Sequence, residues 1–165
     1  MKYPTTRNRR LRKSEAIRSL VRETTLSPND FIVPLFLEEG ENKQTEIAAM
    51  PGYFRYTLDK GLEEINELVK LGIKSVLLFV MVPENKKDNE GNEAINPNAL
   101  MPKSIREIKN QFIEICVMSD VAFDPYSIHG HDGIVKDDKI LNDQSLELLQ
   151  KMAILHAEAG VDFDH

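Results

Sequence analysis

Apolar residues along the chain form two alternating kinds of pattern, and their order predicts an α/β fold. Short, nearly continuous apolar runs, typical of strands buried on both faces, lie at residues 31–37, 74–82, 114–121 and 161–163. Between them, apolar residues recur at helical spacing over residues 57–71, 104–112 and 143–159. Strands that alternate with helices in this way indicate parallel strands joined by right-handed crossovers.

Residues at the ends of these segments support the assignments. Thr57 and Asp143 are placed to cap the first and third helices, and Gly72 and Gly160 follow their last turns. Pro34 has no backbone N–H, so one side of the first strand should be unpaired near it.

The apolar spacing also predicts which side of each helix faces the core. In the first helix these positions are Leu58, Leu62, Ile65 and Val69. In the second they are Ile105, Ile108 and Phe112. In the third they are Leu146, Leu149, Ala153 and Ala157.

Two architectures fit this order of elements: an open doubly wound sheet, or part of a (β/α)₈ barrel. A complete barrel needs about 200–250 residues or more, and the chain has 165. It has room for about half a barrel, and its last strand has no covering helix after it. We therefore expect residues 31–165 to form a partial, truncated barrel of about four strands and three helices.

Composition excludes several classes of protein. Charged residues make up 29% and hydrophobic residues 41%, as in ordinary globular domains. No apolar run approaches the roughly 20 residues of a membrane span, and the first residues lack the apolar core of a secretory signal. Cys116 is the only cysteine and lies in an apolar strand, so we expect a buried thiol, no disulfide within the chain and a cytoplasmic location.

The net charge of −6 conceals an asymmetry. Residues 1–22 carry eight basic side chains against the single acid Glu15, so the rest of the chain is strongly acidic. Residues 1–30 therefore form a basic arm, which could dock on a second copy, stay solvated or bind nucleic acid. No aromatic residues interleave with the arginines, which disfavours nucleic acid. We expect self-association through the arm, with no nucleic-acid or membrane partner.

The segment that follows the third strand carries most of the candidate chemistry. Its ionisable and hydroxyl side chains are Asp120, Asp124, Tyr126, Ser127, His129, His131 and Asp132. Loops at the carboxyl ends of parallel strands are where α/β proteins place their sites. The carboxylates could bind Mg²⁺, hold a substrate ammonium group, accept a proton, or simply cap the next turn. Two histidines two residues apart, without a thiolate, are a weak zinc signal.

Residues 120–133, which read D-V-A-F-D-P-Y-S-I-H-G-H-D-G, resemble the metal loop of the 5-aminolevulinate dehydratase family, also called porphobilinogen synthases. Other stretches resemble the same family in the same order. They are R-x-R-R-L-R at 7–12, L-V-R-E-T-T-L-S-P-N-D-F-I-V-P-L-F at 20–36, M-P-G-Y-F-R-Y-T-L-D at 50–59, L-G-I-K-S-V-L-L-F at 71–79, N-E-A-I-N-P-N-A-L at 92–100 and L-N-D at 141–143. Such a colinear series is more specific than any single motif.

The resemblance implies a (β/α)₈ barrel with an extended N-terminal arm that embraces a neighbouring subunit, usually in octamers. It implies the condensation of two 5-aminolevulinate molecules to porphobilinogen in haem biosynthesis. Zinc-dependent members carry three cysteines where this chain has Ala122, Asp124 and Asp132, so the pattern implies Mg²⁺ at Asp124 and Asp132 and no catalytic zinc. Asp120 matches an active-site aspartate of the family, and we take Ser127 and His131 as further candidate catalytic residues.

The same resemblance places the two Schiff-base lysines of the family beyond residue 165. The chain's own Lys136, Lys139 and Lys151 match neither position, and we expect the 165 residues alone to be inactive. One rival hypothesis is a non-catalytic half-barrel that associates with full-length subunits. Another is an unrelated receiver-type domain in which Asp120 and Asp124 hold Mg²⁺.

Overall fold

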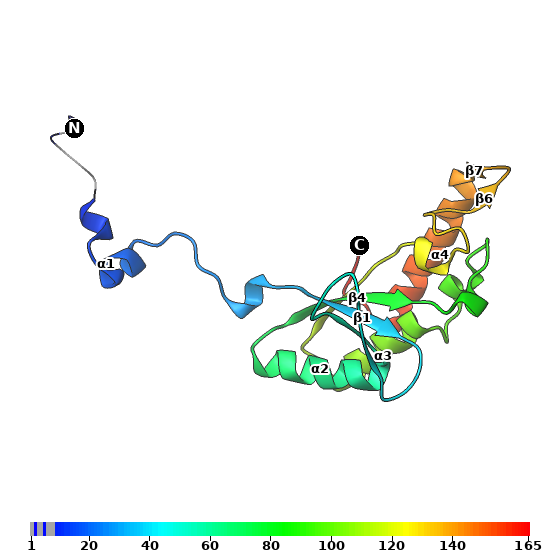
Figure 1. The fold of residues 1–165 in the computed structure, drawn as a ribbon, viewed down its shortest axis with the longest axis horizontal. Helices are drawn as coiled ribbons and strands as arrows, with labels where there is room; N and C mark the ends of the chain where they lie inside the picture. Colours follow the sequence, from blue (N-terminus) through cyan, green and yellow to red (C-terminus); the bar gives the residue numbers. More distant parts are fainter. Residues whose placement is uncertain (1, 3–4, 6–8) are drawn as a thin grey trace.

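A computed structural model describes residues 2, 5 and 9–165, and its centre is a six-stranded sheet of order β2-β3-β1-β4-β5-β8 (Figure 1). The strands of this sheet are β1 (Val33–Glu38), β2 (Gln44–Glu46), β3 (Phe54–Tyr56), β4 (Ser75–Met81), β5 (Cys116–Ser119) and β8 (Phe163–Asp164). The helices are α1 (Glu15–Leu20), α2 (Leu58–Lys70), α3 (Leu100–Gln111) and α4 (Asn142–Ala159). A separate hairpin joins β6 (Val135–Lys136) to β7 (Lys139–Ile140).

The order of the strands decides between the two expected architectures. Strands β1, β4, β5 and β8 are parallel, and each pairs with the next one along the chain. A doubly wound sheet would reverse this order at a switch point and carry helices on both faces. Here α2 and α3 pack on the same face of β1, β4 and β5. The sheet is therefore an opened segment of a (β/α)₈ barrel, and the predicted fold class is confirmed.

The core lies between this face and the helices. It brings Leu35 and Leu37 of β1, Val76 and Leu78 of β4 and Val117 of β5 against the helices. Ile65 of α2 and Ile105 and Ile108 of α3 are fully buried there, as the helical spacing predicts. Strand β3 pairs only with Phe36 and Leu37 of β1, so the side of β1 near Pro34 is unpaired there, as expected.

The expected inward face of the third helix is only partly right, since Leu149 packs against the core and Ala153 is half-buried. Leu146 is 55% exposed and Ala157 is also exposed, whereas the residues that α4 buries are Ser145, Leu148, Met152, His156 and Ala159. Two of these are polar, so apolar spacing identifies only part of the buried side of the helix. The helix also begins at Asn142, which places Asp143 in the first turn rather than at the cap.

Smaller expectations also differ. Val69 of α2 is 42% exposed, while its neighbour Leu68 packs against the core. Thr57 precedes α2, but its hydroxyl hydrogen-bonds the backbone of Lys43 instead of capping the helix. Cys116 is half-buried rather than buried. The short strands β2, β3, β6 and β7 give no periodic signal and were not predicted.

Candidate functional site

On the face of the sheet opposite the helices, paired residues of neighbouring strands place their side chains in a row across the sheet. Phe36 of β1 pairs with Phe79 of β4, and their rings stack with centroids 5.2 Å apart. Arg55 of β3 pairs with Phe36 on the other side. Leu78 pairs with Ser119, so the next residue, Asp120, follows opposite Phe79. The alternation of strand side chains thus places Arg55, the two rings and Asp120 on the same face.

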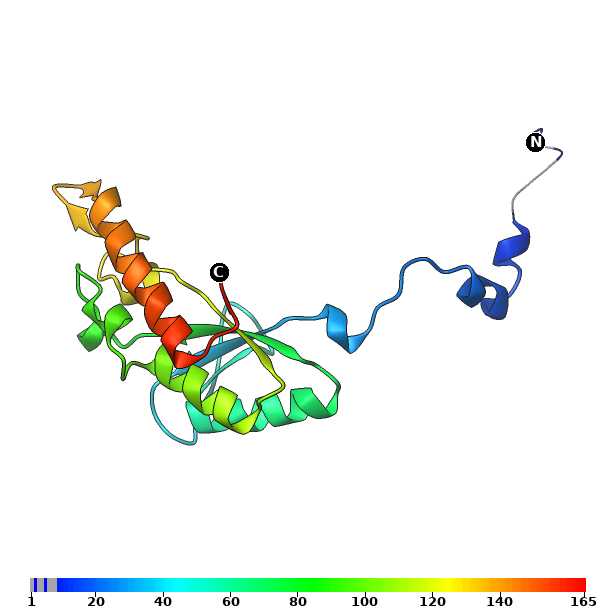
Figure 2. The same cartoon turned by 180° about the vertical axis from the view of Figure 1, so that it is seen from behind.

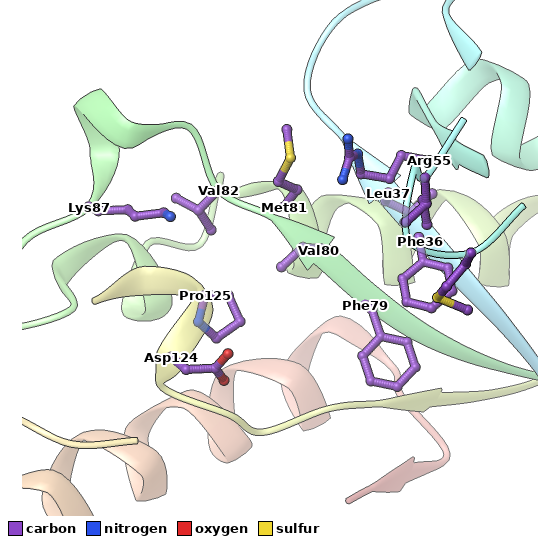
Figure 3. A pocket seen from close by; sticks show the side chains of 12 residues that line it. Phe36, Leu37, Arg55, Phe79, Val80, Met81, Val82, Lys87, Asp124 and Pro125 are labelled. Atoms are coloured by element: carbon purple, nitrogen blue, oxygen red, sulfur yellow. The ribbon is translucent and has the colours of Figure 1, made fainter. Parts of the chain in front are cut away.

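A cavity of about 310 Å³ opens over Arg55, Phe36 and Phe79 at the carboxyl ends of β1 and β4, and Asp120 is not among the residues that line it (Figure 3). Its lining is mostly apolar and includes Phe36, Phe79 and Val80. Three charged side chains also line it: Arg55 on one side, and Lys87 and Asp124 on the other (Figure 3). The cavity therefore combines an apolar floor with charges of both signs.

The carboxylates of the loop after β5 lie close enough to perturb one another. Asp124 begins a short 3₁₀ helix, Asp124–Tyr126, and its backbone N–H donates to Asp132 Oδ1 at 3.4 Å. Burial raises the pKa of Asp124, and the neighbouring Asp132 and Asp120 raise it further. Burial also raises the pKa of Asp120, and Asp132 adds to this while His165 opposes it. A carboxyl with a raised pKa is a better proton acceptor at neutral pH than an ordinary one.

The segment 88–95 holds this loop in place. Asp88 N–H donates to the carbonyl of Tyr126, and Ile128 N–H donates to the carbonyl of Asp88. Gly91 lies against the ring of Phe123, which is completely buried and directly precedes Asp124. The position of Asp124 therefore depends on a second loop that is distant in sequence.

Ser127 and His131 stand apart from the cavity. Ser127 is buried, and its hydroxyl accepts a hydrogen bond from the backbone N–H of His129, so it supports the shape of the loop. His131 is exposed at the tip of the loop. Neither residue lines the cavity, and their assignment as catalytic residues stays a prediction.

Comparison with known proteins identifies the family. The sequence profile described as "Delta-aminolevulinic acid dehydratase" matches residues 5–163. The chain belongs to the delta-aminolevulinic acid dehydratase family. It is 47% identical to the dehydratase of Chlamydia pneumoniae over 94% of its own length and 47% of that protein, and 46% identical to that of Bacillus subtilis over 94% and 48%.

A solved structure of the same family shares the fold. The delta-aminolevulinic acid dehydratase (porphobilinogen synthase) of Toxoplasma gondii ME49, in complex with the reaction product porphobilinogen, superposes with a TM-score of 0.91 at 39% identity. The match covers 96% of this chain and 46% of that one. The chain thus spans about half the length of the delta-aminolevulinic acid dehydratases that it matches.

The metal expected from the family resemblance can be tested against the residues present. Among the described residues, no group of three or more His, Cys, Asp or Glu side chains could hold a metal ion. Asp124 and Asp132 nevertheless form a close pair of oxygen donors, and Mg²⁺ often binds through one or two carboxylates while keeping its waters. The donor set therefore fits Mg²⁺ and, lacking thiolates, does not fit a structural zinc site.

A buried hydrogen-bond network next to Asp120 was not predicted from the sequence. Ser119 Oγ donates to Asp164 Oδ1 at 2.6 Å and lies 2.9 Å from His156 Nδ1. Because the single hydroxyl proton goes to Asp164, the Ser119 oxygen accepts from His156, which assigns the imidazole proton to Nδ1. His156 Nε2 is buried and has no partner among the described residues. The network ties α4 to the ends of β5 and β8, one residue before Asp120.

This network should make stability fall in mild acid. Burial lowers the pKa of His156 below its ordinary 6.5, although Asp164 opposes the effect. The unfolded chain then binds a proton before the folded chain does, so stability is lost as the pH falls below about 6.5. In thermal unfolding, His156→Asn, which keeps a donor at the Nδ1 position but does not titrate, should flatten the decrease in Tm between pH 7 and 5.

His156→Leu provides the matched comparison. Leucine has neither a hydrogen-bond donor nor an ionisable group. This variant should therefore show a flatter pH dependence of Tm and also be about 1 kcal/mol less stable than the parent chain at pH 7. An unchanged pH dependence in both variants would contradict the assignment.

Proposed function

We propose that the chain supplies the amino-terminal half of a porphobilinogen synthase, which condenses two molecules of 5-aminolevulinate to porphobilinogen with the loss of two waters. The observation that carries the proposal is the close match to the Toxoplasma gondii enzyme in complex with porphobilinogen. The position of Asp120 supports it, because a carboxylate with a raised pKa stands at the carboxyl end of a parallel strand. Its proposed role is to accept a proton from the substrate during condensation.

The proposed metal is Mg²⁺, held by Asp124 and Asp132. When bound, it would supply positive charge that polarises a substrate oxygen or acidifies a water. The protein's own contribution is to hold the two carboxylates together through the Asp124 backbone and the loop that Ser127 supports. Calorimetric titration with Mg²⁺ tests this, because Asp124→Asn should abolish binding while Asp138→Asn, in the exposed β6–β7 turn, should not.

We further propose that residues 1–30 act as an arm that embraces a neighbouring copy, with octamers formed by the full-length protein. The arm extends away from the body (Figure 2), and Leu20 and Leu26 are 84% and 78% exposed on it. Arg7, the first arginine of its motif, lies outside the described residues. Light scattering should give a lower assembly mass when residues 1–30 are deleted.

The proposed location is the cytoplasm. Among the described residues, no helix has the length and apolar character needed to cross a membrane.

The activity is tested with a chimera, in which the chain is joined to the remaining half of the Bacillus subtilis relative. This chimera should form porphobilinogen from 5-aminolevulinate, whereas the 165-residue chain alone should give no more than a no-enzyme control. A chimera that folds and shows no product would contradict the proposed function. Turnover by the chain alone would contradict the expected dependence on the other half.

The exposed outer face of α4 favours the second candidate, a non-catalytic half-barrel that associates with complete subunits. Leu146 and Ile154 are 55% and 50% exposed on α4 and have no apolar partner among the described residues. Phe163 of β8 is 62% exposed on the sheet face opposite the helices. Recovery of the short chain in complex with a full-length enzyme, without product formation by the chimera, would support it.

A further inference from the structure

The carboxylate loop, which follows β5, has two parts. The first, residues 124–128, begins with Asp124, and the second, residues 133–135, directly follows Asp132. The tip between the two parts is exposed, and a Cβ at Gly130 would meet nothing within 4 Å. Packing at the tip therefore does not fix the distance between the two carboxylates, and contacts elsewhere must hold the two parts together.

The backbone of Asp88 holds the first part. Its N–H donates to the carbonyl of Tyr126 at 3.2 Å, and its carbonyl accepts a hydrogen bond of 3.3 Å from Ile128 N–H. The Asp88 carboxylate accepts from both the backbone N–H and the side-chain amide of Asn92, at 3.1 and 2.9 Å. Because these bonds fix the course of its own segment, Asp88 gives the loop a well-defined support.

The side chain of the next residue, Asn89, holds the second part. Its Oδ1 accepts a hydrogen bond of 3.1 Å from Val135 N–H. No hydrogen bond joins Asn89 to either carboxylate among the described residues, so it acts on them only through the backbone of the loop. Since Asp88 and Asn89 are consecutive, one point of the chain holds both parts of the carboxylate loop and so determines their separation.

Helix α4 offers a second support for the same loop. Ser145 Oγ accepts a hydrogen bond of 3.0 Å from Ile134 N–H, and Met152 belongs to the same apolar cluster as Tyr126. Apolar contact is not directional, whereas a hydrogen bond fixes both distance and angle. The helix therefore constrains the first part less tightly than the second, and only residues 88–89 hold both parts by hydrogen bonds.

We propose that Asn89 is a positioning residue for the divalent cation that Asp124 and Asp132 hold. It keeps the second part of the carboxylate loop at the separation from the first that lets both carboxylates reach one ion. This inference rests on the proposed Mg²⁺ site and adds a residue, outside the loop, that determines its affinity. If Asn89 only stabilised the fold, its loss would lower stability without a selective loss of cation binding.

The test is calorimetric titration of the folded 165-residue chain with Mg²⁺ alone. Asn89→Ala should weaken binding about tenfold, the lower end of the effect expected when a residue that orients metal ligands is lost. Asn89→Asp keeps the acceptor oxygen, so it should bind Mg²⁺ at least as tightly as the wild-type chain. Asn98→Ala makes the same chemical change at an exposed position outside the loop and should bind like the wild type.

Two further measurements separate positioning from stability. Thr57 is buried and its hydroxyl hydrogen-bonds the backbone of Lys43, so Thr57→Ala should lower Tm without changing the affinity for Mg²⁺. In the absence of metal, amide hydrogen exchange reports on the bond itself. The N–H of Val135 should exchange about tenfold faster in Asn89→Ala, as expected for one lost hydrogen bond, and at the wild-type rate in Asn89→Asp.

Equal Mg²⁺ affinities of the wild type and Asn89→Ala would overturn the inference and leave the metal site standing. Equal losses of affinity in Asn89→Ala and Thr57→Ala, or unchanged exchange at Val135 in Asn89→Ala, would also overturn it. If Asn89→Ala does not fold, Asn89→Gln decides the question, because it moves the amide oxygen by one methylene and should also weaken Mg²⁺ binding.

A wild-type chain that binds no Mg²⁺ would overturn both this inference and the proposed metal site. Porphobilinogen formation by the chimera is measured separately, so the proposed condensation can stand when this inference fails.

Discussion

Changing Asp120 to asparagine in the chimera should slow porphobilinogen formation at least about a hundredfold, the lower limit expected when a general acid or base is lost. Asparagine keeps the size of the side chain and cannot accept a proton. Asp120 follows opposite Phe79 in the strand register, and its carboxylate lies 4.0 Å from His165 Nδ1. Because its pKa is raised above 3.8, the acid side of the pH–rate profile should lie higher than for an ordinary aspartate.

The control for this substitution is Asp138→Asn, which makes the same chemical change at an exposed turn. Its activity should equal that of the parent chimera. Full activity of Asp120→Asn, measured by product formation at saturating substrate, would exclude Asp120 from the chemistry.

Changing Gly91 to alanine should destabilise the chain by about 2–4 kcal/mol, combining left-handed backbone strain with overpacking. Gly91 has φ of +64°, and a Cβ there would lie 2.4 Å from Cε2 of Phe123. The Phe123 ring is completely buried, so it cannot move aside without displacing its neighbours.

Gly130 provides a matched control. Its φ is +63°, and a Cβ there would meet nothing within 4 Å. Gly130→Ala should therefore show the backbone strain alone, about 1–2 kcal/mol, in chemical denaturation. Equal losses in the two variants would show that contact with Phe123 contributes nothing.

Sequence patterns predicted the longer strands and helices because each of them turns apolar side chains toward the same core along its length. Strands β1, β4 and β5 bury one face of the sheet against the helices. Helices α2 and α3 each place an apolar stripe on that face. Part of the inner face of α4 was missed because Ser145 and His156 are stabilised there by hydrogen bonds rather than by apolar contact. Apolar spacing carries no information about such partners.

The candidate site was predicted only where it is local in sequence. Asp120, Asp124 and Asp132 lie on one loop, and the structure brings them together. Arg55 reaches the same face only through the pairing of β3, a strand of three residues, with β1. That pairing joins Phe36 to Arg55 across the loop that contains β2. Arg55 lies in the family-like stretch at 50–59, but that stretch does not indicate which strand it pairs with.

The succession of β1, β4, β5 and β8 has a consequence for how the chain acquires its structure during synthesis. Each strand pairs with one that the ribosome has already released, and partners such as Val33 and Val76, or Met118 and Phe163, are separated by similar, short lengths of chain. The sheet can therefore grow one strand and one helix at a time, without waiting for distant segments. Each newly released unit covers the edge left by the previous one, so an unpaired edge is exposed only for the time needed to translate the next strand and helix.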